Sequence, residues 1–169
     1  MIADIILKAH ADADMAFVNS GAIRCDIPPG KMTYGMLEDT LPYSDPLVLL
    51  AIEGELIQDI LENAVSRIEK PAGCFLQIAG FSFTFDPKAE AFSRVSDIRV
   101  QGAPVAPDRT YKILTTRYIA KGGDDFLMLS EKKPLWTSKK KLREYIASYV
   151  KVKGTISAEV EKRIKRLED

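Results

Sequence analysis

Apolar and polar positions follow different spacings along three parts of the chain. Apolar residues recur at helical spacing in residues 2–10 and 55–66, and Thr33 is placed to cap a short helix that runs to residue 39. Short apolar or alternating runs between turn residues predict strands at residues 15–18, 46–53, 75–78, 81–85, 95–100 and 110–116. Helical spacing returns towards the C-terminus, where Thr137 or Ser138 is expected to cap one helix and Ser157 another.

This order of elements predicts an α+β fold. Helices lie towards both ends and strands gather in the middle, unlike the regular alternation of a doubly wound parallel sheet. The 169 residues match the usual size of one fold, and no repeat or low-complexity linker divides them. We therefore expect a single domain over residues 1–169. The sequence has no GxGxxG, GxxxxGK[ST] or GxSxG motif, so the common nucleotide folds and hydrolase elbows have no support.

Composition argues against two classes of partner. Lys and Arg number 24 and Asp and Glu also 24, whereas a protein that grips nucleic acid needs a basic surplus. The basic runs at residues 139–141 and 162–166 are expected on solvated helix faces. The longest mostly apolar stretch, residues 47–52, is far shorter than a membrane span. We therefore expect no nucleic-acid partner and no membrane insertion.

Metal and redox chemistry also have little support. His10 is the single histidine, so a multi-histidine metal centre cannot be built from this chain. The alternating spacing of His10, Asp12 and Asp14 splays their side chains, and we expect no metal there. Cys25 and Cys74 lack CxxC spacing and are expected to be buried or half-buried small apolar residues. An oxidising compartment would permit a bridge between them, which the sequence alone neither predicts nor excludes.

Three short stretches combine turn residues with functional side chains. They are Asn-Ser-Gly-Ala-Ile-Arg at residues 19–24, Leu-Pro-Tyr at residues 41–43, and residues 118–124, which end in Gly-Gly-Asp. A glycine near Asn19 permits a sharp turn at a strand end, and Arg24 offers a planar fork for phosphate or carboxylate oxygens. Asp124 can accept hydrogen bonds from vicinal hydroxyls. The alternative is structural: a turn satisfied by Asn19, a solvated Arg24 and a helix stop at the glycines.

Two tyrosines lie beside loop residues. Tyr43 and Tyr118 can hold a flat base between them if they face each other, because each ring offers a stacking surface. Taken singly, each is more readily explained as an ordinary half-buried tyrosine with a hydrogen-bonded hydroxyl.

Taken together and in this order, the three stretches resemble the C-terminal domain of the 5'-nucleotidase family. The resemblance also passes through Pro29-Gly30, the helix at Gly54, residues 75–80 and 111–113, and a closing Arg163-Ile164. It implies a fold of helices packed in layers on mixed β-sheets. It also implies a phosphoester hydrolase exported to the periplasm or cell surface, whose substrate is a nucleotide or nucleoside.

The resemblance assigns roles to individual residues. Tyr43 and Tyr118 match the aromatic residues that stack the base, and Asp124 matches the aspartate that holds the ribose hydroxyls. Asn19 and Arg24 are similar to the residues that contact the nucleoside and the phosphate side. Gly122 and Gly123 belong to the same Gly-Gly-Asp motif and are expected at the substrate site with them.

The chain also departs from the family pattern. Asp125 stands where the family usually has glycine, and its charge disfavours two ionised carboxylates close together. The family's divalent metal pair belongs to an N-terminal metallophosphoesterase domain, whose DxH, GNHE and GHxH motifs do not occur here. We therefore expect no cofactor and no catalytic residue in this chain, which would be inactive alone. The alternative is a stand-alone nucleoside-binding module without hydrolytic activity.

Overall fold

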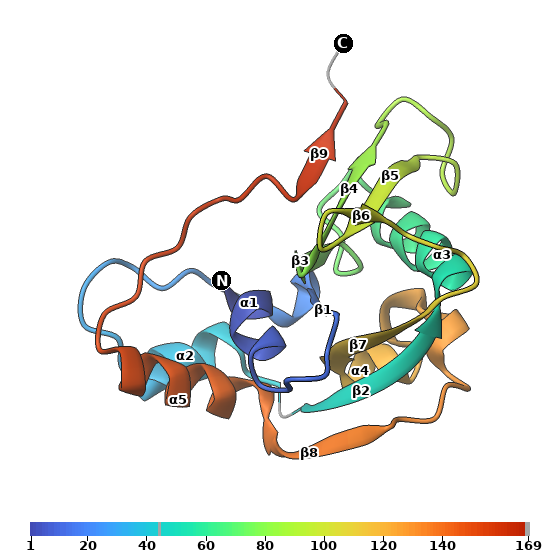
Figure 1. Ribbon diagram of the computed structural model, residues 1–169. Helices are drawn as coiled ribbons and strands as arrows, with labels where there is room; N and C mark the ends of the chain where they lie inside the picture. The colour runs from blue at the N-terminus through green and yellow to red at the C-terminus, as the bar shows by residue number, and fades with distance from the viewer. Residues whose placement is uncertain (44, 168–169) are drawn as a thin grey trace.

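A mixed sheet forms the centre of the molecule in the computed structural model, which describes residues 1–43 and 45–167. Its five strands lie in the order β3-β1-β7-β2-β8 (Figure 1). The strands are β1 (Met15–Asn19), β2 (Pro46–Glu53), β3 (Leu76–Ala79), β7 (Thr110–Thr116) and β8 (Trp136–Lys141). Strands β1 and β7 run parallel, whereas the other neighbours are antiparallel.

Both faces of this sheet are covered, which explains why its inner strands β1 and β2 are almost wholly apolar. Side chains alternate between faces, so Ala16 and Val18 of β1 join one core while Met15 and Phe17 join the other. The first core is closed by α1 (Ile2–Leu7), α2 (Tyr34–Thr40) and α5 (Leu142–Lys153). The second is closed by α3 (Gly54–Val65) and α4 (Arg117–Ala120).

A second, four-stranded sheet extends the core on the α3 side. Its order is β6-β5-β4-β9, made of β4 (Phe81–Phe85), β5 (Val95–Val100), β6 (Ala103–Pro104) and β9 (Ile164–Arg166). Strand β9 pairs in parallel with β4, and the others are antiparallel. The two mixed sheets with helices packed on them confirm the expected α+β fold.

Most predicted elements are found with small changes at their ends. Thr33 caps α2, its hydroxyl accepting the Met36 N–H at 3.2 Å. Gly54 begins α3 instead of breaking the chain. Its backbone packs so tightly on Ala106 that a Cβ would lie 2.0 Å from the Ala106 carbonyl oxygen, which explains the glycine at this position. Helix α4 was not predicted; it is one short turn capped by Thr116.

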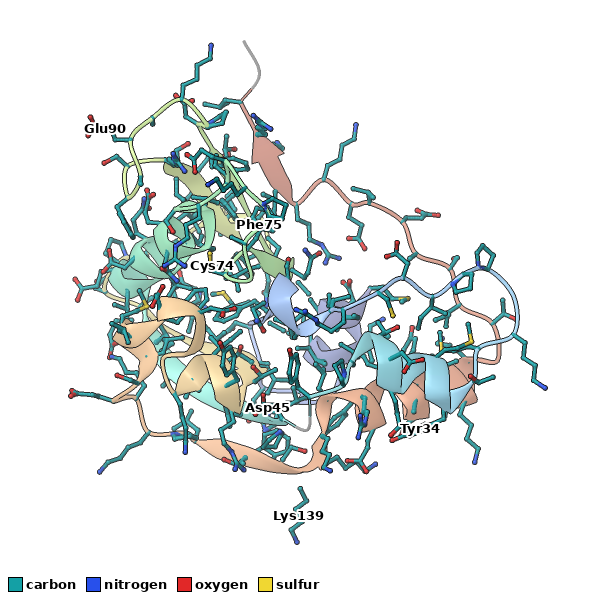
Figure 2. The ribbon with its side chains drawn as sticks, turned by 180° about the vertical axis from the view of Figure 1, so that it is seen from behind. Tyr34, Asp45, Cys74, Phe75, Glu90 and Lys139 are labelled. Atoms are coloured by element: carbon teal, nitrogen blue, oxygen red, sulfur yellow. The ribbon has the colours of Figure 1, made fainter. Side chains whose placement is uncertain are left out.

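Two predictions near the C-terminus are wrong. Thr137 and Ser138 lie in β8 rather than capping a helix, since residues 136–141 pair with β2; the helix begins at Leu142, after a Lys141 cap. Lysines 139–141 are therefore exposed on an edge strand, not a helix face, where positive charge discourages pairing with other chains. Figure 2 shows Lys139 projecting from the body of the molecule.

Ser157 does not cap a helix either. Residues 155–163 run without helix or strand to β9, whose pairing with β4 overrides the weak helical spacing of Val160, Ile164 and Leu167. Val160 is 91% exposed, so the apolar stripe assumed by that prediction does not exist. Arg163 fixes this segment instead, because it forms an ion pair with Asp4 and donates to a carbonyl oxygen of β3.

Within the described residues, none of the helices has both the length and the apolar character needed to cross a bilayer.

Both cysteines are free thiols. Cys25 is exposed, so the expectation of a buried or half-buried residue is wrong there; Cys74 is buried, and burial raises the pKa of its thiol.

Candidate functional site

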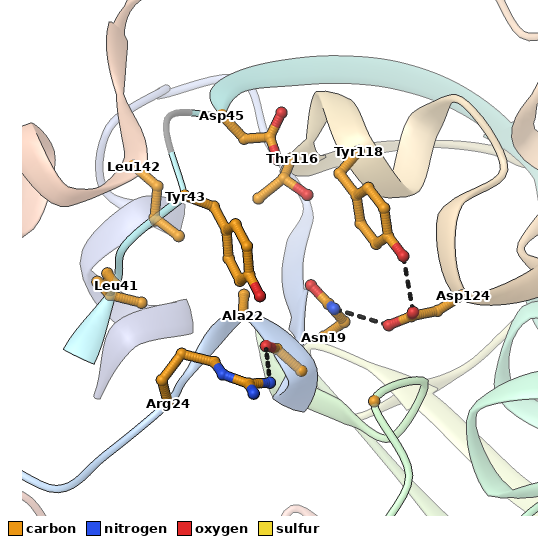
Figure 3. Close-up of a pocket in the computed structure, with 12 residues that line it drawn as sticks. Asn19, Ala22, Arg24, Leu41, Tyr43, Asp45, Thr116, Tyr118, Asp124 and Leu142 are labelled. Atoms are coloured by element: carbon orange, nitrogen blue, oxygen red, sulfur yellow. Dashed lines mark hydrogen bonds between the residues drawn. The ribbon is translucent and has the colours of Figure 1, made fainter. Parts of the chain in front are cut away.

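A pocket of about 310 Å³ opens where the chain leaves β1, enters β2 and leaves β7 (Figure 3). The five polar and aromatic residues singled out from the sequence all line it: Asn19, Arg24, Tyr43, Tyr118 and Asp124. Its other lining residues are Gly21, Ala22, Leu41, Asp45, Gly73, Thr116 and Leu142. Segments separated by as many as 123 positions in sequence therefore meet at one concave surface.

The Asp124 carboxylate is the centre of a hydrogen-bond network. Asn19 donates from Nδ2 to Oδ2 of Asp124 at 2.7 Å, and the Tyr118 hydroxyl donates to Oδ1 at 2.8 Å. The hydrogen bond to Asp124, burial and the nearby negative charge raise the pKa of Tyr118. Each carboxylate oxygen keeps a further lone pair, so the group is held in place and still able to accept hydrogen bonds.

Asn19 has an acceptor to spare. The residue is only 4% exposed, and its Oδ1 finds no hydrogen-bond partner within the part of the chain that the structure describes. A buried acceptor without a partner costs about 1–3 kcal/mol. A ligand donor placed in the pocket would remove this cost.

The loop that carries Asp124 has an unusual backbone. Gly122 has φ 88°, and Asp124 and Asp125 also have positive φ, 53° and 65°. The buried side chain of Asn63 on α3 donates to the Asp124 carbonyl oxygen at 3.0 Å, and this hydrogen bond stabilises the backbone conformation of the loop. Strained backbone held by its surroundings is typical of positions where a side chain must be aimed.

The two motif glycines act through space and backbone. Gly122 and Gly123 do not line the pocket. Gly122 supplies the left-handed turn, and Gly123 lies against the Tyr118 ring, where a Cβ would come within 2.5 Å of the ring carbon Cζ. The absence of a side chain at residue 123 therefore determines where the Tyr118 ring sits.

Tyr43 and Tyr118 differ from an ordinary core tyrosine. They are 52% and 44% exposed, and Figure 3 shows their rings on opposite sides of the pocket. Tyr111, by comparison, is 1% exposed, and its hydroxyl accepts a backbone N–H. The exposed rings leave stacking surface available to a ligand.

Arg24 supplies positive charge at the mouth of the site. It is exposed, and its guanidinium donates only a long hydrogen bond of 3.3 Å, to the Gly21 carbonyl oxygen. No carboxylate is paired with it among the residues described. Most of its donors therefore remain available to an anion.

Asp125 does not add its charge to the pocket. Its carboxylate forms an ion pair with Arg67 on the segment after α3, and Asp125 is not among the lining residues. The expected repulsion between Asp124 and Asp125 is thus offset by a cation that the sequence analysis did not identify.

Other site residues were also missed. Gly73 lies so close to the Asp124 carboxylate that a Cβ there would be 3.1 Å from Oδ2, and Asp45 and Thr116 line the pocket between the tyrosines. Asp45 follows the Leu-Pro-Tyr stretch by two residues, and this proximity was the one available signal. Asn63 and Gly73 carried none, because Asn63 reaches the site from α3 and Gly73 from the turn before β3, where its carbonyl oxygen accepts the Gly21 N–H.

The described residues contain no group of three or more His, Cys, Asp or Glu side chains that could hold a metal ion. Asp14 instead accepts the Lys112 N–H and lies near Arg109. The side chains of the described residues therefore do not fit a divalent metal pair.

The chain is similar in sequence to known proteins. The chain matches the family described as "5'-nucleotidase, C-terminal domain" over residues 1–131. It is 31% identical over 129 residues to the trifunctional nucleotide phosphoesterase protein YfkN of Bacillus subtilis, covering 73% of this chain and 9% of that protein. It is 27% identical over 162 residues to 5'-nucleotidase of Rattus norvegicus, covering 89% of this chain and 28% of the relative.

Solved structures show the same fold. The 5'-nucleotidase precursor of Thermus thermophilus superposes with a TM-score of 0.92 at 33% identity, over 99% of this chain and 34% of that one. The NAD nucleotidase of Haemophilus influenzae superposes with a TM-score of 0.84 at 21% identity, over 98% of this chain and 32% of that one, and shows the fold alone. The chain spans a third or less of the curated relatives it matches. This chain belongs to the 5'-nucleotidase C-terminal domain family.

Proposed function

We propose that this chain is the nucleotide-recognition part of a 5'-nucleotidase-type phosphoester hydrolase. In this proposal the base stacks between Tyr43 and Tyr118, and Asp124 accepts hydrogen bonds from the ribose hydroxyls. Arg24, together with Asn19 on the nucleoside side, orients the phosphate end towards a metal-bearing phosphoesterase domain outside this chain. The contribution of the chain is positioning, which raises the effective concentration of the reacting groups.

The arrangement of acceptors carries the proposal. Asp124 is fixed by Asn19 and Tyr118 yet keeps free lone pairs, and the buried Oδ1 of Asn19 lacks a partner among the described residues. Vicinal hydroxyls are two adjacent donors, which suit two adjacent acceptors of this kind. The exposed faces of Tyr43 and Tyr118 lie on either side of the same pocket, where a flat base would gain stacking energy.

The charges favour a ligand with one anionic end. Arg24 lies at the pocket without a carboxylate partner among the described residues, and Asp124 lies on the opposite side of Asn19 (Figure 3). A phosphate near Arg24 and hydroxyls near Asp124 place each ligand group beside a protein group of suitable chemistry.

Calorimetric titration with AMP tests this function. We expect AMP to bind the chain, and Tyr118→Ala to weaken binding by about 1–3 kcal/mol through loss of stacking. The matched control is Tyr34→Ala, because Tyr34 is also exposed, at 51%, but lies on α2 and does not line the pocket (Figure 2). Failure of both AMP and GMP to bind, or equal weakening by both substitutions, would contradict the proposal.

The same proposal predicts that the chain alone releases no phosphate from AMP, because its described residues hold no metal-binding cluster. Metal-dependent phosphate release by the purified chain, with contaminating phosphatase excluded, would contradict the proposal that hydrolysis belongs to a separate metal-bearing domain.

The proposal also includes export of the protein to the periplasm or cell surface, as the family resemblance implies.

A further inference from the structure

Asp45 is a pocket residue to which the nucleotide-binding roles above give no task. It lies directly before β2, half-buried, and lines the same pocket as Tyr43 and Tyr118. Its carboxylate has no hydrogen bond or ion pair within residues 1–43 and 45–167. A half-buried carboxylate in a binding pocket that has no direct partner keeps its lone pairs available to hydrogen-bond donors of a ligand.

The electrostatics of Asp45 agree with this view. Burial raises the pKa of its carboxyl, and the charge of Arg117 opposes this rise without forming an ion pair with Asp45. Its backbone carbonyl oxygen accepts the Leu142 N–H at 2.9 Å. The backbone is therefore fixed by the start of α5, whereas the side chain remains available.

Position within the pocket decides which part of a nucleotide Asp45 can meet. Figure 3 shows its carboxylate beside Thr116, between the two tyrosine rings, while Asn19 and Asp124 lie towards the other end. A base stacked between Tyr43 and Tyr118 with its ribose at Asp124 directs its edge away from the sugar towards Asp45.

Thr116 completes the pattern of donors and acceptors at this end. Its Oγ1 accepts the Ile119 N–H at 3.4 Å as the cap of α4, which leaves its hydroxyl proton to donate. Asp45 as a carboxylate accepts only. A base edge that matches the pair offers one acceptor beside two donors.

Guanine has this edge: its O6 accepts, and its N1–H and N2–H donate side by side, as a bidentate partner for a carboxylate. Hypoxanthine keeps O6 and N1–H but lacks the second donor. Adenine presents an amino donor next to an acceptor nitrogen, which would face the carboxylate unfavourably. We infer that Asp45, with Thr116, selects guanine nucleotides at this pocket; the inference rests on the nucleotide-binding function proposed above.

Calorimetric titration with GMP, IMP and AMP tests the inference, because GMP and IMP differ only in the 2-amino group. We expect GMP to bind at least about five-fold more tightly than IMP and AMP, as expected for one good bidentate pair. Asp45→Asn, which keeps the side-chain size and the backbone contact to Leu142, should reduce this difference to less than about two-fold. The control Asp39→Asn, at an exposed position on α2 outside the pocket, should preserve it.

The outcomes separate this inference from the function on which it rests. Equal binding of the three nucleotides, with all three weakened by Tyr118→Ala, would overturn the guanine preference and leave nucleotide binding intact. Retention of the preference in Asp45→Asn would overturn the role of Asp45. Failure of all three nucleotides to bind would overturn both proposals.

Discussion

Replacement of Gly123 by alanine tests how the pocket is built. An added Cβ would lie 2.5 Å from Cζ and 2.6 Å from Cε1 of the Tyr118 ring. Carbon atoms pack best at about 3.5–4.0 Å, so the ring must move by about 1 Å. The backbone of Gly123 does not require glycine, since its φ lies outside the left-handed region, and the change therefore acts through the ring.

The expected consequence is a loss of affinity with little loss of stability. A displacement of about 1 Å breaks the 2.8 Å hydrogen bond from the Tyr118 hydroxyl to Asp124 and tilts the stacking face. We expect Gly123→Ala to weaken AMP binding by about 1–3 kcal/mol, or roughly 5- to 150-fold in Kd. The ring is 44% exposed and can move into solvent, so the free energy of unfolding should change by less than about 1 kcal/mol.

A double-mutant cycle with Tyr118→Ala is the decisive assay. If alanine at residue 123 acts only through the ring, it costs nothing further once the ring is gone, and the two effects are strongly non-additive. NMR of ring-labelled tyrosine gives a second readout, because loss of the bond to Asp124 should lower the raised Tyr118 pKa towards its ordinary value. Additive effects on affinity, or unchanged AMP binding by Gly123→Ala, would refute this reasoning.

Three further predictions concern the fold that holds the site. Gly54→Ala should lower the free energy of unfolding in urea by about 1–3 kcal/mol, because its Cβ would lie 2.0 Å from the carbonyl oxygen of Ala106. A change below about 0.5 kcal/mol, the size of a neutral surface substitution, would contradict this close packing. Burial works to raise the pKa of Asp4, but its hydrogen bond to Arg163 and the nearby N-terminal charge outweigh burial and lower it. The ionised Asp4 therefore adds to the free energy of unfolding above the ordinary carboxyl pKa of about 4, and this contribution is lost as pH falls through the lowered pKa of Asp4 in the folded state. Arg163→Gln should make the free energy of unfolding, followed by circular dichroism, depend less on pH in the acid range. Glu62→Gln should cost about 1–3 kcal/mol in thermal unfolding, since the buried carboxylate accepts two backbone N–H groups at the start of β5; an unchanged Tm would argue against that role.

The sequence predicted which polar and aromatic residues come together at one pocket better than it predicted the C-terminal elements. Asn19, Tyr43 and Asp124 were found because turn residues beside functional side chains form local motifs, and the family resemblance joined motifs that lie far apart. The contact between Asn19 and Asp124 spans 105 positions and was therefore beyond any local pattern. Asn63, which supports the Asp124 backbone from α3, looked like one more polar residue of an amphipathic helix.

The errors at residues 136–167 have a shared cause. Thr137 is a good helix cap by type, but the open edge of β2 pairs with it instead. Ile164 fits a helical spacing, but the open edge of β4 takes it into β9. In both cases tertiary pairing outweighs a weak local preference, and a pattern read along one segment carries no information about an edge strand formed elsewhere.

A crystal structure of the chain with bound GMP tests the central claim most directly. The account predicts the base between the rings of Tyr43 and Tyr118, the ribose hydroxyls on Asp124 and the phosphate on the Arg24 side. A nucleotide bound outside this pocket, or inside it with the base away from both tyrosine rings, would contradict the account.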